Sequence, residues 1–242
     1  MTLLVFIGLF VPVMLSGGLM FIFTSGRKDT NWVKLLVAFS GAYLLALCFL
    51  DIIPEIYSTE NVSKVGLLIL GGFFIQIILD FFTHGVEHGH NQHSDDHYHE
   101  IPTSMIVALC IHSFLEGMPL ASGMYNAGFQ HKLLTGIIIH NIPISIVLST
   151  FLLQADSKRS TSFILLTIFA LSAPVGTVVS GILGEVLIKH ISLFFSFTMA
   201  VVVGIFLHIS TTILFESEEN HKFNFYKLGF VLLGILIAVI NM

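Results

Sequence analysis

The stretch MIVALCIHSFLEGMPLASGM (105–124) places His112 and Glu116 inside an apolar run long enough to cross a membrane. A second run, TGIIIHNIPISIVLSTFLL (135–153), does the same with His140. Ionisable side chains are costly in hydrocarbon, so they usually face a partner or a polar pathway. Because His112 and Glu116 are four residues apart, they share one face of a helix. Imidazole and carboxylate groups together suit a divalent transition metal, so the two runs predict an intramembrane metal site.

The composition is that of an integral membrane protein. Of 242 residues, 55% are hydrophobic and only 10% are charged, whereas a soluble domain carries about 25% charged residues. The opening TLLVFIGLFVPVMLSGGLMFIF (2–23) lacks a basic start and a small-residue cleavage site. We therefore expect a retained transmembrane helix there and not a signal peptide. Cys48 and Cys110 lie in apolar runs, so we expect buried thiols and no disulfide.

Eight apolar segments divide the chain, each near the length of about 20 residues that a helix needs to span hydrocarbon. Because backbone groups must be satisfied internally there, we expect every segment to be helical. The predicted fold class is all-α, a polytopic membrane helix bundle of eight transmembrane helices forming a single domain over residues 1–242. The expected spans are 3–23, 33–57, 63–83, 103–124, 132–154, 161–184, 191–214 and 223–241.

The basic residues predict the orientation. Lys and Arg in cytoplasmic connections outnumber those outside. One set of alternate connections holds Arg27, Lys28, Lys34, Lys158, Arg159, Lys222 and Lys227. The other set holds Lys64, Lys132 and Lys189. We therefore expect the first set in the cytoplasm and both termini outside it.

The sequence also contains a weak internal similarity between two apolar segments. GAYLLALCFLDIIPE (41–55) aligns with GIFLHISTTILFESE (204–218), sharing a glycine, an aromatic residue, a leucine and a final glutamate. Coincidence between two apolar runs explains this equally well. If the similarity reflects a genuine repeat, helices 1–3 and 6–8 form an inverted repeat, as in many transporters.

His112, Glu116 and His140 are the main candidate ligands. A short connection joins their two helices, so we expect these helices to be antiparallel neighbours that bring the three side chains together. Two imidazoles and a carboxylate, completed by water or another side chain, are a usual ligand set for zinc. The alternative is that His112 and Glu116 only hydrogen-bond each other and hold the bundle together.

Prolines accompany the candidate ligands. Pro143 lies three residues after His140, and we expect it to break its helix and leave the carbonyl of Ile139 free. Freed carbonyls in broken midplane helices can line an ion path. We expect the same interruption at Pro54, Pro119 and Pro174.

Asp51 and Glu55 in FLDIIPEIY (49–57) are also four residues apart. They form either an ordinary interfacial acidic cap or a carboxylate ladder that attracts and passes on a cation. His208 is a lone histidine in an apolar run, and we expect it to have a packing role.

A histidine-rich connection follows the third segment, at about 84–100. On the predicted topology it is cytoplasmic, and such tracts bind metals by weak multivalent coordination. The alternative is a solvated tether, and in both cases we expect no fixed structure without metal. Its histidines are His84, His88, His90, His93, His97 and His99.

At these residues the chain resembles the ZIP family of zinc- and iron-regulated transporter proteins. HSFLEG (112–117) is similar to the family's fourth-helix signature, HNIP (140–143) to the fifth, DIIPE (51–55) to the second and APVG (173–176) to the sixth. The resemblance covers nearly the whole chain. It implies metal-facing positions for His112, Ser113, Glu116, His140, Asn141, Asp51 and Glu55.

Two departures concern the number of ions. Ile144 and Ala173 stand where many family members have glutamates, and Ser113 replaces a common asparagine. Those groups build a second, bridged metal site in binuclear members. The chain therefore resembles a member that lacks the usual second-site glutamates, and we expect a single site.

The resemblance implies uptake of divalent metal ions into the cytoplasm, with zinc as the main ion and iron or manganese as competitors. We expect no enzymatic activity and no cofactor. The expected partners are divalent metals and the lipid bilayer; a homodimer is left open, and nucleic acid is not expected. The alternatives are a metal-sensing or transport-inactive paralogue, prompted by Ile144 and Ala173, and an intramembrane zinc-dependent hydrolase, which needs a further base. Another kind of metal transporter, a cation-diffusion-facilitator exporter, would need six helices and a sizeable cytosolic domain, and the sequence predicts neither.

Overall fold

A computed structural model of the chain describes residues 3–23, 31–59, 62–83, 103–121, 127–155, 158–186, 191–215 and 225–241. These residues are almost entirely helical, and no strand occurs among them. The predicted all-α class is therefore confirmed. The histidine-rich connection, with its six predicted metal-binding histidines, lies outside the described residues.

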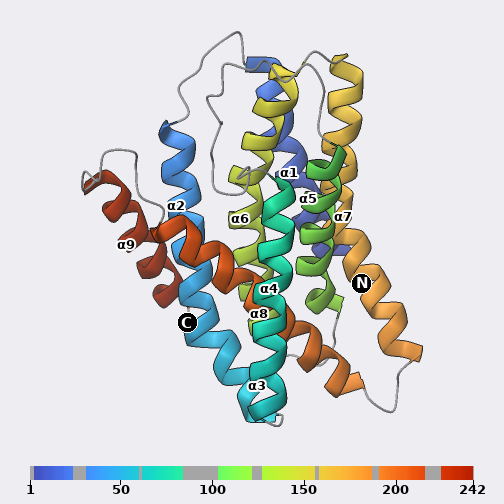
Figure 1. The fold of residues 1–242 in the computed structure, drawn as a ribbon, viewed down its shortest axis with the longest axis vertical. Coiled ribbons are helices and arrows are strands. Elements are labelled where there is room, and N and C mark those ends of the chain that lie inside the picture. The colour runs from blue at the N-terminus through green and yellow to red at the C-terminus, as the bar shows by residue number, and fades with distance from the viewer. Residues whose placement is uncertain are drawn as a thin grey trace.

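All eight predicted segments are helical over the residues that the structure describes. The second segment runs through α2, a π-helical turn η1 and α3, and the fourth runs from α5 into a 3-10 turn, η3 (Figure 1). Seven segments are long and apolar enough to cross a membrane, whereas α9 is a shorter apolar helix of 16 residues. The bounds are α1 Leu3–Phe23, α2 Asn31–Leu47, η1 Cys48–Ile52, α3 Ile53–Thr59, α4 Val62–Thr83, α5 Thr103–Gly117, η3 Met118–Ala121, α6 Ala127–Gln154, α7 Arg159–Val186, α8 Ile191–Phe215 and α9 Phe225–Ile240.

The four prolines behave in two ways. The helix changes to the wider π-turn just before Pro54 and to a 3-10 turn at Pro119. In contrast, α6 and α7 continue as α-helices through Pro143 and Pro174, so the predicted breaks at these two prolines are wrong. The reason is that a proline removes one hydrogen bond, and the rest of a 28-residue helix, supported by its neighbours, holds the backbone.

Two groups of helices make up the bundle. In the first helix group, α1 packs against α6 and α7, and α5 packs against α7. In the second helix group, α2 packs against α8 and α9, and α4 packs against α8. The groups meet where α2 contacts α6 and where α4 contacts α5. Figure 1 shows α9 and α7 on opposite sides of the molecule, with α4 between them in this view.

Glycines allow the closest helix crossings. A Cβ built at Gly117 or at Gly176 would lie 2.0 Å from a carbonyl oxygen of the opposite helix in the α5–α7 pair. In the α4–α8 pair, a Cβ at Gly72 would lie 2.0 Å and one at Gly204 1.9 Å from such an oxygen. Small residues let helix backbones approach in this way inside membranes. Because Gly117 directly follows Glu116, the α5–α7 crossing also fixes the position of the candidate ligand.

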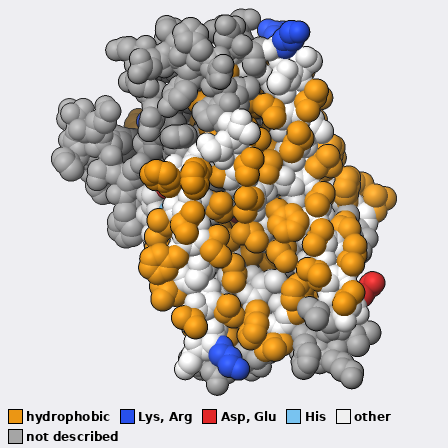
Figure 2. All heavy atoms as spheres, turned by 45° about the vertical axis from the view of Figure 1, so that its right-hand side comes forward, with side chains coloured by type: hydrophobic (Ala, Val, Ile, Leu, Met, Phe, Trp, Pro, Cys, Tyr) orange, Lys and Arg blue, Asp and Glu red, His pale blue; other side chains and the backbone are white. Residues whose placement is uncertain are grey.

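The outer surface is apolar. Large hydrophobic side chains are exposed along α1, α4, α7 and α9, among them Ile22, Phe81 and Ile168. Figure 2 shows one face covered by hydrophobic side chains, with Lys and Arg at its top and bottom ends. A surface of this kind would be unfavourable in water and fits hydrocarbon. Together with the seven long apolar helices, it identifies a multi-pass membrane protein.

Two minor expectations have different outcomes. The thiol of Cys48 is buried and that of Cys110 is half-buried, and both cysteines are free. The inverted repeat of helices 1–3 and 6–8 remains a prediction.

Candidate metal site

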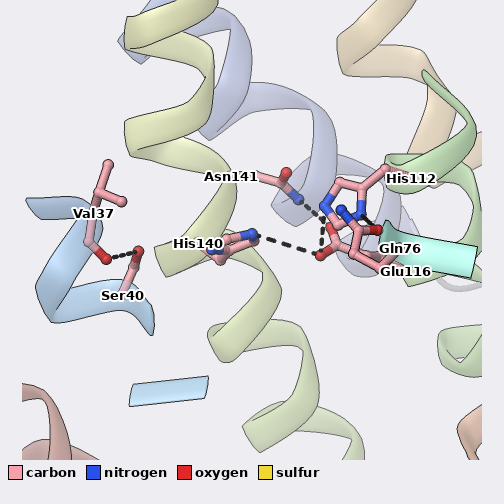
Figure 3. Close-up of polar contacts among 7 residues, drawn as sticks. All are labelled: Val37, Ser40, Gln76, His112, Glu116, His140 and Asn141. Atoms are coloured by element: carbon pink, nitrogen blue, oxygen red, sulfur yellow. Dashed lines mark hydrogen bonds and ion pairs between the residues drawn. The ribbon is translucent and has the colours of Figure 1, made fainter. Parts of the chain in front are cut away.

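Three buried side chains converge between α5 and α6. His112 and Glu116 come from α5 and His140 comes from α6, and one ligand atom from each lies within 4.8 Å of the others. The Nε2 atom of His112 is 3.1 Å from Oε1 of Glu116, and the Nε2 atom of His140 is 3.8 Å from the same oxygen. The two imidazole rings are nearly perpendicular, with centroids 6.0 Å apart. We call these residues the three-residue cluster (Figure 3).

The two helices that carry the cluster are held mainly by other neighbours. α5 packs chiefly against α7, and α6 packs chiefly against α1. Direct packing between α5 and α6 is slight, so the prediction that they are packed neighbours is wrong. The three side chains nevertheless reach toward one another and meet. The four-residue spacing in α5 places His112 and Glu116 on one face, as expected.

The spacing of the cluster suits a single metal ion. Two ligand atoms bound to one tetrahedral zinc at about 2.1 Å lie about 3.4 Å apart. The nitrogen-to-oxygen separations of 3.1 and 3.8 Å bracket that value. A small shift of His140 would bring all three atoms onto one ion.

Burial makes a cation at this position favourable. The three side chains are between 0% and 1% exposed. A carboxylate removed from water needs a compensating positive charge, and a divalent ion bound by Glu116 and two neutral imidazoles would supply it. The cluster is thus chemically able to bind a divalent transition metal.

Asn141 orients the carboxylate of the cluster. Its side-chain amide donates a hydrogen bond from Nδ2 to Oε2 of Glu116, at 3.3 Å. This bond leaves Oε1 directed toward the two histidines. The Oδ1 atom of Asn141 has no hydrogen-bond partner among the described residues. Ser113 is buried on α5, next to His112 in the chain.

Gln76 of α4 is a contact that reasoning from the sequence missed. Its Oε1 atom lies 3.1 Å from Nδ1 of His112, and its side chain is fully buried. Gln76 is the only polar residue in FFIQIIL (73–79). The rule that singled out the histidines, a polar group within an apolar run, could have found it.

A comparison with known protein families gives a match over the whole chain. The family model described as ZIP zinc transporter matches residues 1–104 and 103–242, which together cover the whole chain. The chain belongs to the ZIP zinc transporter family. A comparison with curated proteins gives no match. Membership in the ZIP family implies divalent metal transport.

At two positions this ZIP chain lacks the glutamates that the sequence comparison with the family leads one to expect. Ile144 of α6 and Ala173 of α7 are both buried, at 1% and 3% exposure. Neither side chain has an oxygen atom, so neither can bind an ion. Among the described residues, Glu116 is the one carboxylate in the cluster.

Asp51 and Glu55 lie outside the three-residue cluster of this ZIP chain. Asp51 sits in η1, and its Oδ1 atom accepts a hydrogen bond from Nζ of Lys132 on α6, at 2.6 Å. Glu55 is half-buried in α3. In this conformation the carboxylate of Asp51 is engaged by an ammonium group.

His208 of α8 packs edge-on against Phe73 of α4, with ring centroids 5.0 Å apart. This contact agrees with the packing role expected from the sequence.

Proposed function

We propose that this protein carries divalent transition-metal ions, zinc above others, across the membrane into the cytoplasm through one site formed by His112, Glu116 and His140. The observation that supports this most is the three-residue cluster, fully buried in a bundle of membrane-spanning helices. Imidazole and carboxylate ligands favour zinc, and iron or manganese would compete for the same groups. Water or Glu55 would complete the coordination shell.

The proposal includes a single ion at the site. Two divalent ions about 4 Å apart would repel each other by about 16 kcal/mol at an effective dielectric constant of about 20. Bridging carboxylates offset such repulsion in two-metal sites. Glu116 alone is available, because Ile144 and Ala173 contribute no oxygen and Ser113 and Asn141 are neutral.

The proposed direction, uptake into the cytoplasm, is what the family resemblance implies, and it is joined to a proposed topology. The uneven distribution of Lys and Arg supports both termini outside the cytoplasm. The histidine-rich connection at 84–100 would then face the cytoplasm and bind further ions weakly. We propose neither a resident cofactor nor a catalysed reaction.

One observation favours a second candidate function. Ile144 and Ala173 stand where many family members have glutamates, so two carboxylates are missing here. Such a loss is expected of a metal-sensing paralogue that binds zinc but does not transport it. A flux measurement separates the two, since a sensor would bind zinc without moving it.

The test is zinc uptake by liposomes that contain the purified protein and an internal zinc-sensitive dye. The variants His112→Ala, Glu116→Ala and His140→Ala should lose uptake by about tenfold or more, because each removes a ligand. His208→Ala is the matched control, since it removes a buried histidine that packs against Phe73 and lies outside the cluster. Normal uptake by all three ligand variants would show that the proposed site is wrong.

A further inference from the structure

Gln76 occupies an unusual position for a polar side chain. It lies in the middle of α4, between Ile75 and Ile77, which are 38% and 40% exposed on the apolar surface. The side chain of Gln76 itself is fully buried and faces His112 (Figure 3). Polar residues inside membrane helices are costly and usually functional.

The contact decides which nitrogen of His112 is available to a metal. A neutral imidazole has one N–H group and one nitrogen lone pair. Oε1 of Gln76, 3.1 Å from Nδ1, accepts a hydrogen bond from that nitrogen. Nε2 then carries the lone pair, and it lies 3.1 Å from Oε1 of Glu116. These two atoms repel each other unless a cation lies between them.

The opposite arrangement would block the site. If the amide nitrogen of Gln76 faced Nδ1, that nitrogen would have to accept, and the proton would sit on Nε2. A protonated Nε2 cannot bind a metal. The hydrogen-bond acceptor at Gln76 therefore selects the tautomer that binds an ion through Nε2.

We propose that Gln76 is a positioning residue of the metal site, which holds His112 with Nε2 directed at the transported ion. The inference rests on the proposed function and deepens it. Metal-bound histidines usually donate their second N–H group to an acceptor, and loss of that acceptor typically lowers metal affinity about 10- to 100-fold.

The acceptor comes from a different helix group than the ligands. α4 packs against α8 in the second helix group, whereas α5 packs against α7 in the first. The hydrogen bond between Gln76 and His112 thus joins the two groups at the ion. The affinity of the site depends on the placement of α4 against α5.

The test measures the zinc dissociation constant of the purified protein by competition with a zinc-binding dye, and the KM and maximal rate of zinc uptake in liposomes. Gln76→Leu should raise the dissociation constant and KM about 10- to 100-fold, with a much smaller change in maximal rate. Gln76→Glu should stay close to the wild type, because a carboxylate also accepts from Nδ1. Gln130→Leu is the matched control, since Gln130 donates to the carbonyl of Leu120 at 2.8 Å and does not belong to the cluster.

A nitrogen-15 NMR spectrum of histidine-labelled, metal-free protein gives an independent readout. The wild type and Gln76→Glu should show His112 protonated at Nδ1, and Gln76→Leu should show loss of that tautomer. A purely structural role for Gln76 would lower thermal stability without this difference. Should Gln76→Leu fail to fold, Gln76→Met, which also lacks a strong acceptor, takes its place under the same criteria.

Glu116→Ala separates this inference from the proposed function. If Glu116→Ala loses zinc binding and uptake while Gln76→Leu keeps the wild-type dissociation constant, the positioning role is overturned and the site stands. If Glu116→Ala binds and transports zinc normally, the proposed function fails, and the role of Gln76 fails with it.

Discussion

Glu116 connects the three-residue cluster through both of its oxygen atoms. Oε1 faces the Nε2 atoms of His112 and His140, at 3.1 and 3.8 Å, and Oε2 accepts the hydrogen bond from Asn141. Asn141 therefore fixes the orientation of the carboxylate without being charged itself. The motifs in the sequence identified all four of these residues. They did not identify Gln76, because spacing along one helix shows which side chains share a face but not which helix packs opposite.

Replacing Asn141 with leucine should weaken zinc binding. The variant removes the donor to Oε2, and a hydrogen bond to a charged group contributes about 1.5–3 kcal/mol, so we expect the dissociation constant to rise about tenfold or more. Dye competition on the purified protein measures it. Gln130→Leu is the control and should change affinity much less, since Gln130 donates to the carbonyl of Leu120 and does not belong to the cluster. Equal affinities of Asn141→Leu and the wild type would argue against this role for Asn141.

The sequence predicted the bounds of the helices closely and their irregular turns poorly. The segment 3–23 coincides with α1 Leu3–Phe23, and 63–83 differs by one residue from α4 Val62–Thr83. Apolar length determines such helices, since lipid forces the backbone to bond to itself. The π-turn η1 could not be located, because its position depends on how the chain accommodates Pro54. Nor could Lys132 be predicted as the partner of Asp51, because this pair joins α6 to η1.

The close crossing of α4 and α8 should depend on Gly72 and not on the adjacent Gly71. A Cβ at Gly72 would lie 2.0 Å from the carbonyl oxygen of Val201, whereas one at Gly71 would meet nothing within 4 Å. We expect Gly72→Ala to destabilise the protein by about 1–3 kcal/mol, as overpacking does. Gly71→Ala should be neutral or slightly stabilising, because alanine favours helices. Thermal unfolding in detergent compares the two variants, and equal melting temperatures would contradict the described crossing.

Within the complete bundle, the cluster lies where the two helix groups meet, and the exterior around it is apolar. Composition alone predicted the membrane bundle, and the family match over the whole chain agrees with it. The arrangement into two groups was not predictable, because every helix is apolar on most sides and the sequence pattern does not select its neighbours. The side of the membrane on which each end lies remains a prediction from the basic residues.

Deletion of residues 88–99 should leave transport intact. The deletion removes five of the six histidines of the connection. We expect that tract to buffer or sense metal and not to carry it across the membrane. Uptake into liposomes at low zinc should match the wild type, and the response to high zinc should differ. The control is replacement of residues 88–99 by a serine- and glycine-rich tract of equal length, which removes the histidines and keeps the length of the connection. Complete loss of uptake in both variants would refute the predicted role.

The most direct test of the single intramembrane site is the number and position of zinc ions in a crystal structure of the 88–99 deletion variant soaked with zinc. Anomalous scattering locates each ion without reference to the protein model. We predict one fully occupied peak in the bundle, bound by Nε2 of His112, a carboxylate oxygen of Glu116 and a ring nitrogen of His140. Two fully occupied peaks about 4 Å apart, a typical two-metal spacing, or a bundle peak away from these three residues would contradict it.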